Sequence, residues 1–115
     1  FNEELEEITA LKLIVKEFAV TAKQDGKLPI VLLFNVQGYD DHLYQLLRQT
    51  LAENSIPFVS THNIVPATDI RNFIGDGHFT KSANKLIAAE VLKLMNQRLN
   101  RPATNPQIID NLLTE

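Results

Sequence analysis

Two short apolar runs separate three stretches with helical periodicity, and this alternation restricts the chain to few folds. Residues 30–34 and residues 56–60 are almost entirely apolar and lack the polar alternation of a strand with one solvent-exposed face. Such runs are typical of strands in a parallel sheet that helices cover on both faces. The order helix, strand, helix, strand, loop and helix therefore predicts an α/β layered fold with right-handed crossovers.

Apolar residues at spacings of three and four predict the three amphipathic helices. The expected ranges are residues 3–24, about 41–53 and about 81–99. The expected N-caps, in chain order, are Asn2, then Asp40 or Asp41, and finally Thr80. Asp25-Gly26 is the expected end of the first helix.

The loop of residues 61–79 has no clear period, and we expect only one turn of helix in it, near residues 67–72. A loop of this length in a compact domain is usually functional. Residues 102–107 contain two prolines and predict a linker, and we expect residues 108–113 to form a short helical turn. We therefore assign residues 1–101 to the α/β domain and residues 102–115 to a C-terminal tail.

Two strands are few for a globular sheet, which usually contains about five or six. The three predicted helices also carry more apolar surface than two strands can cover. The chain starts at Phe1 rather than at Met. We therefore expect it to be the C-terminal half of a larger domain, or to pair with another chain.

The composition excludes several classes of function. The net charge is −3 and Lys and Arg are not clustered, so a nucleic-acid surface is not expected. The absence of cysteine removes disulfides, thiolate catalysis and cysteine metal sites. No apolar run reaches the length of a membrane span. Asp40, Asp41 and His42 point in different directions on a helix, and the spacing of His62, Asp69, Asp76 and His78 supports no metal site. Neither a metal nor a cofactor is therefore expected, and the compartment stays unassigned.

The candidate chemistry lies in Asp76-Gly77-His78, where the long loop meets the last helix. A carboxylate that orients a histidine is half of a charge-stabilised proton shuttle. This loop and the loop after Phe34 both leave the carboxyl edge of the predicted sheet, where α/β proteins bind their ligands. From the spacing alone, a purely structural role is equally compatible, with Asp76 stabilising a turn and His78 preceding the helix.

The stretch Asp76-Gly77-His78-Phe79-Thr80, followed by Ala83-Asn84-Lys85-Leu86-Ile87-Ala88, resembles the last conserved block of the SGNH (GDSL-type) esterase and lipase superfamily. The upstream order of a long helix, the strand of residues 29–34, a helix and the strand of residues 56–59 is also similar. The resemblance covers about residues 5–99. The family commonly has two residues between the acid and the histidine where this chain has one, and Asn84 stands where many members have glycine.

The resemblance implies a flavodoxin-like three-layer fold with a parallel sheet, and a serine hydrolase that acts on ester bonds. His78 would be the general base and Asp76 the acid that orients it. The family's Gly-Asp-Ser segment and its oxyanion donors have no counterpart here, and Ser55, Ser60 and Ser82 stand in capping or surface contexts. The nucleophile is therefore expected on a missing N-terminal half of the same domain, and the substrate would be an acyl or acetyl ester of a lipid or sugar.

Two alternatives remain open from the sequence. The same three catalytic residues serve an O-acyltransferase when water is excluded from the site. A non-catalytic α/β module that binds a ligand or partner at the edge of the sheet would need neither Asp76 nor His78 as a catalyst. Several other residues have undecided roles as cleft walls, core or surface, namely Tyr39, Tyr44, His62 and Phe73, while Asn35 follows the first strand and is not assigned.

Overall fold

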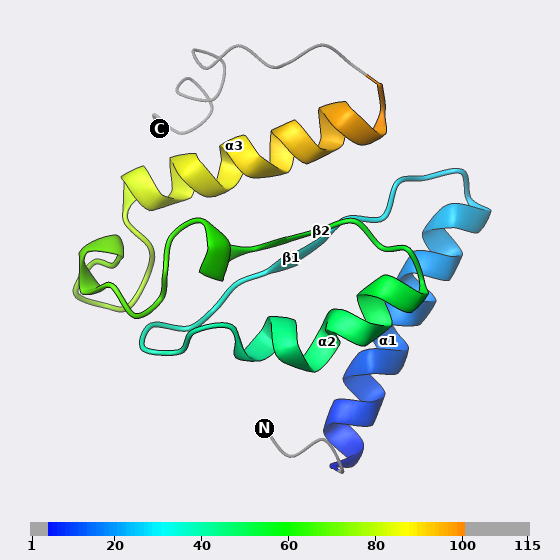
Figure 1. Cartoon of the computed structure of the whole chain (residues 1–115), viewed down its shortest axis with the longest axis horizontal. Helices are drawn as coiled ribbons and strands as arrows, with labels where there is room; N and C mark the ends of the chain where they lie inside the picture. Colours follow the sequence, from blue (N-terminus) through cyan, green and yellow to red (C-terminus); the bar gives the residue numbers. More distant parts are fainter. Residues whose placement is uncertain (1–4, 101–115) are drawn as a thin grey trace.

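The computed structural model describes residues 5–100, which form a small mixed α/β structure (Figure 1). The elements in chain order are α1 (Glu6–Gln24), β1 (Val31–Leu33), α2 (His42–Glu53), β2 (Phe58–Ser60), η1 (Thr61–Asn63), η2 (Ile70–Asn72) and α3 (Lys81–Arg98). The predicted alternation of helices and strands is confirmed. The expected cap Asn2 and the predicted tail of residues 102–115 lie outside the described residues.

The two strands pair in parallel, with Val31 opposite Phe58 and Leu33 opposite Ser60. α2 is the crossover between them. α3 lies on one side of the strand pair, and α1 and α2 lie together on the other side (Figure 1). Because the strands are parallel, both of their carboxyl ends open onto the same edge of the sheet.

The core has two parts. The larger part joins α1, α2 and β1 and consists of Val15, Ala19, Leu33, Leu47, Leu51 and Ile56. The smaller part joins α3 to the long loop and consists of Val65, Ala83 and Ile87, with Ile64 and Phe79 packed against it. The long loop is thus attached to the fold through buried side chains before it reaches Asp76.

The prediction that the first strand is buried on both faces is wrong in part. The side chains of Leu32 and Phe34 are partly exposed, although Leu33 is buried. The reason is that β2 is the only strand beside β1 among residues 5–100, so one edge of β1 has no neighbouring strand in this part of the chain. Part of the expected apolar stripe of α1, including Ile14 and Phe18, is also exposed.

The helix ends agree with the sequence at two of the three described caps. The hydroxyl of Thr80 accepts a hydrogen bond of 3.1 Å from the backbone N–H of Ala83 at the start of α3. α1 ends at Gln24, with Asp25 as its C-cap, and the next residue is Gly26, whose φ of +70° favours glycine. Asp41 precedes α2 but makes no side-chain cap, because its carboxylate accepts from the side chain of Gln45 at 2.9 Å instead.

The remaining boundaries differ from the prediction by small amounts. Each strand is shorter than its apolar run, because only three residues of each find ladder partners. The expected turn near residues 67–72 is the 3₁₀ turn η2, and a second such turn, η1, directly follows β2. Within residues 5–100, no helix combines the length and the apolar character needed to cross a bilayer.

Candidate functional site

Asp76 and His78 lie on a tight hairpin, which we name the Asp76–His78 hairpin and define as residues 73–79. The backbone N–H of Ile74 donates to the carbonyl of His78 at 2.8 Å, and that of Gly77 donates to the carbonyl of Ile74 at 3.0 Å. Gly77 has a φ of +88°, in the left-handed region that favours glycine. A turn that ends in a left-handed glycine is a common short hairpin, so local chemistry sets this bend.

Aromatic packing holds the base of the hairpin. Phe73 and Phe79 pair as an antiparallel bridge, and their rings stack with centroids 4.7 Å apart. Phe79 also packs against the core beneath α3, and its ring centroid lies 5.8 Å from that of Phe34, the residue after β1. The base is therefore fixed to the sheet and to α3, while the tip that carries Asp76 and His78 faces solvent.

The two side chains of the candidate pair meet directly. Oδ1 of Asp76 lies 2.9 Å from Nδ1 of His78 and also accepts the backbone N–H of His78 at 3.0 Å. These bonds favour the ionised carboxylate, so the backbone N–H of His78 and then its imidazole lower the pKa of Asp76 below its ordinary value. With Nδ1 bonded to the carboxylate, Nε2 on the opposite side of the ring is the nitrogen that can accept a proton.

The pair is open to water. The side chain of His78 is 80% exposed and that of Asp76 is 60% exposed. An exposed imidazole can reach a hydroxyl supplied from outside the described residues. Exposure also weakens the electrostatic coupling between the two groups, because water screens their charges.

Asp69 repeats the backbone part of this geometry a few residues upstream. Its Oδ1 accepts the backbone N–H of Arg71 at 3.0 Å, and its Oδ2 lies 2.8 Å from Nη2 of Arg71. An aspartate that accepts from the residue two positions on stabilises a turn in many loops. The backbone bond of Asp76 is thus a common local motif, and the imidazole on its carboxylate is the feature that separates the two sites.

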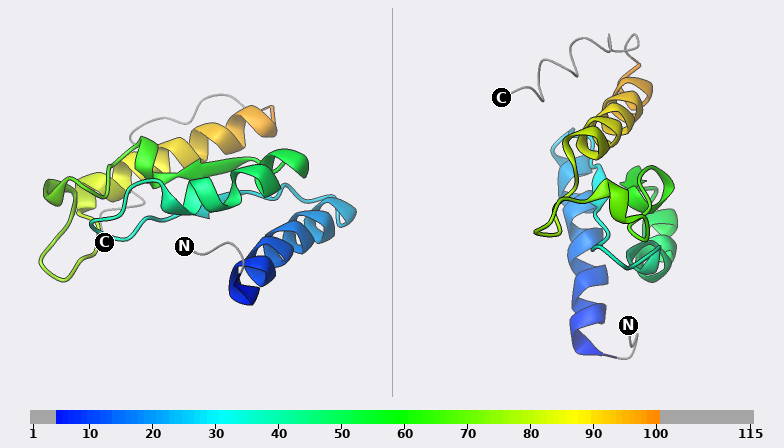
Figure 2. Two further views of the ribbon diagram at one scale, coloured as in Figure 1. Left: turned by 60° about the horizontal axis from the view of Figure 1, so that its bottom comes forward. Right: turned by 90° about the vertical axis from the view of Figure 1, so that its left-hand side faces the viewer.

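The hairpin lies at the carboxyl edge of the strands, as the sequence predicts for a functional loop. The backbone N–H of Gly38, in the loop after β1, donates to the carbonyl of Ala67 in the long loop at 2.7 Å. A Cβ on Gly77 would lie 3.7 Å from Oε1 of Gln37. In the right-hand view of Figure 2, the loop that carries the hairpin lies on the opposite side from α2. On that side, β1 has no neighbouring strand among the described residues.

The three serines of the chain, all within residues 5–100, do not contribute to the Asp76–His78 pair. Ser55 and Ser82 are exposed, as expected, at the end of α2 and in the first turn of α3. The expectation for Ser60 is wrong, because its side chain is buried at the end of β2 and its hydroxyl contacts Nδ1 of His62. Within residues 5–100, none of the three serines is hydrogen-bonded to His78.

Three of the residues whose roles the sequence left undecided, Tyr44, His62 and Phe73, occupy two different parts of the fold. Tyr44 and His62 pack on each other with centroids 5.3 Å apart, and Tyr44 also stacks on Phe58, so both belong to the side of the fold near β2. Phe73 is buried in the base of the hairpin. In the described part of the chain, no group of three or more His, Asp or Glu side chains is placed to hold a metal ion.

Tyr39 lines a cavity at the carboxyl end of β1, which is one of the roles that its sequence context left open. The cavity has a volume of about 550 Å³, and its lining residues are Asn35, Val36, Tyr39, His42 and Leu43. The available signal was the polar residue Asn35 immediately after an apolar strand, because such residues sit where α/β proteins bind ligands.

Comparison with known proteins adds no relative: no family model matches the chain, and neither a curated protein nor a solved structure is significantly similar to it. The fold and site therefore define a mixed α/β chain with a parallel strand pair and an acid–imidazole pair at its edge.

Proposed function

We propose that this chain supplies the histidine and the aspartate of an SGNH-type serine hydrolase that cleaves ester bonds. The observation that carries the proposal is the 2.9 Å contact between Oδ1 of Asp76 and Nδ1 of His78 on an exposed hairpin. That contact orients the imidazole with Nε2 outward, as a general base requires. The nucleophilic serine would come from a segment outside this chain.

The architecture supports a larger domain around this pair. β1 has a neighbour on one edge only among the described residues, and apolar side chains of α1 such as Ile14 and Phe18 are exposed. A further parallel strand beside β1 would pair its open edge and bring its own carboxyl end next to the hairpin. We propose that this strand belongs to the N-terminal half of a flavodoxin-like three-layer domain, of which this chain is the C-terminal half.

The proposed reaction uses the two residues in a fixed order. Nε2 of His78 takes the proton of the serine hydroxyl as its oxygen attacks the ester carbonyl, and then returns that proton to the leaving alcohol. A water molecule then attacks the acyl-enzyme while Nε2 takes its proton, and the proton returns to the serine oxygen as the carboxylic acid leaves. Asp76 keeps the proton on Nδ1 and stabilises the imidazolium cation that forms in each step. The exposure of His78 favours hydrolysis over acyl transfer, since acyl transfer needs water to be excluded.

Replacing Asp76 by Asn tests the role of the carboxylate in a protein that joins this chain to its serine segment. Asn keeps an oxygen that accepts the backbone N–H of His78, so the hairpin is retained, but the negative charge is lost. We expect kcat for p-nitrophenyl acetate to fall about 10- to 100-fold, a modest loss for a triad aspartate because the pair is solvated. The measurement is steady-state hydrolysis at neutral pH.

Asp69→Asn is the matched control, because Asp69 makes the same bond to the residue two positions on but faces no imidazole. We expect its kcat to stay within about twofold of the parent value. The lowered pKa of Asp76 keeps its carboxylate ionised in mild acid, so we do not expect mild acidification to remove its negative charge. Equal losses in both variants would remove Asp76 from the mechanism.

A further inference from the structure

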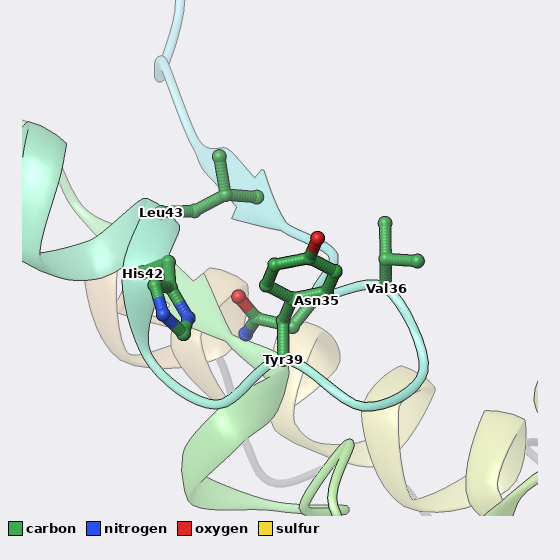
Figure 3. Close-up of a pocket in the computed structure, with 5 residues that line it drawn as sticks. All are labelled: Asn35, Val36, Tyr39, His42 and Leu43. Carbon is green, nitrogen blue, oxygen red and sulfur yellow. The ribbon is translucent and has the colours of Figure 1, made fainter. Parts of the chain in front are cut away.

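The cavity at the carboxyl end of β1 has a polar end and an apolar wall (Figure 3). At the polar end, the amide of Asn35 points toward the imidazole of His42. The wall is formed by the side chains of Val36 and Leu43 together with the ring of Tyr39. None of these five lining residues carries a carboxylate, an ammonium or a guanidinium group, so the site suits an uncharged ligand.

The polar end of the cavity is held rigidly. Asn35 is only 4% exposed, and its backbone N–H and its Nδ2 both donate to the hydroxyl of the fully buried Thr61, at 3.0 and 3.3 Å. Thr61 directly follows β2, so these bonds join the ends of the two strands. A buried amide that is fixed from behind is a preorganised polar contact for a ligand.

The apolar wall is unusually accessible. Val36 is 68% exposed and Tyr39 is 54% exposed, although both line a hollow and not a flat surface. The volume of about 550 Å³ falls within the usual range for small-molecule sites. A saturated hydrocarbon group would cover the wall at no cost in unpaired polar groups, whereas a sugar would leave most of its hydroxyls unpaired there.

The cavity belongs to the same edge as the catalytic pair. Its loop, residues 35–41, contacts the long loop through the bond between Gly38 and Ala67, and Gln37 lies beside Gly77 at the tip of the hairpin. A substrate that spans the two loops would place one part in the cavity and another near His78.

We propose that this cavity binds the short aliphatic acyl group of the ester substrate. This inference rests on the proposed function for its choice of ligand. The hydrocarbon chain lies against Val36, Tyr39 and Leu43, and the ester carbonyl oxygen is the group that meets the amide of Asn35. Specificity for the acyl group thus comes from the loop after β1, and the chemistry comes from the hairpin.

The chain has two tyrosines, and this allows a direct binding test on all 115 residues. Fluorotyrosine labelling gives two ¹⁹F NMR signals, which Tyr39→Phe assigns. Methyl butyrate should shift the Tyr39 signal saturably, with a Kd of roughly 1–10 mM for so small a ligand. The Tyr44 signal should stay fixed, because Tyr44 packs on Phe58 and His62 outside the cavity.

Val36→Trp should fill the cavity and weaken binding at least about tenfold, without loss of fold because Val36 is exposed. Leu13→Trp, at an exposed position of α1, is the control and should leave the Kd unchanged. A shift that does not saturate, an equal shift of both tyrosines, or stronger binding of methyl glucoside would overturn the acyl site. These results do not depend on the activity of His78 variants, so the two proposals fail separately.

Discussion

Replacing His78 by Ala is expected to lower kcat for p-nitrophenyl acetate about 10²- to 10⁴-fold in a protein that joins this chain to its serine segment. The physical reason is the loss of the group that removes the serine proton and returns it to the leaving alcohol. KM should change little, because the imidazole lies on an exposed tip and the proposed acyl cavity is formed by another loop.

Added imidazole should restore part of the lost activity, after subtraction of the reaction that imidazole catalyses by itself. The exposed position of His78 leaves room for the free base. A merely structural role of His78 would show no such rescue. Lys81→Ala, at an exposed position in the first turn of α3, is the control and should keep its activity. Undiminished kcat in His78→Ala would remove the general base and with it the proposed function.

Leu51→Ala should lower the free energy of unfolding by about 2–5 kcal/mol, as expected for truncating a fully buried leucine. Leu51 is 1% exposed and belongs to the core that joins α1, α2 and β1. The substitution removes apolar contact on several sides and leaves a cavity that the two helices and the strand cannot close. Urea denaturation followed by circular dichroism measures the change.

Leu13→Ala is the matched control, because the same truncation occurs on the exposed side of α1. Its effect should stay within about 0.5 kcal/mol. Equal losses for the two variants would contradict the assignment of the core, and with it the packing that places the loop after β1 at the edge of the sheet.

The order of the elements was predictable because helices and buried strands have different apolar periods. Thr80 and Gly26 marked helix ends correctly, since capping depends on neighbours a few residues away. The exposure of Leu32 and Phe34 was not predictable, because it depends on which elements lie beside β1 in space. A periodic pattern shows which face is apolar but not whether another element covers it.

In the candidate site, too, features set by neighbouring residues were predictable and features set by distant residues were not. The bend at Asp76-Gly77-His78 depends on neighbouring residues, because Gly77 has a positive φ and the carboxylate of Asp76 accepts the backbone N–H of His78. The cavity could not be derived from the sequence, because Asn35 at its polar end is held by Thr61, which is 26 residues away along the chain. The burial of Ser60 likewise reflects packing from distant parts of the chain.

The central claim is that Asp76 fixes His78 with the proton on Nδ1 and leaves Nε2 as the base. Long-range ¹H–¹⁵N NMR of the imidazole nitrogens tests this on the chain itself, because it distinguishes the two neutral tautomers. We expect the Nδ1–H tautomer for His78 and its loss in Asp76→Ala. A dominant Nε2–H tautomer for His78 in the parent chain would contradict it.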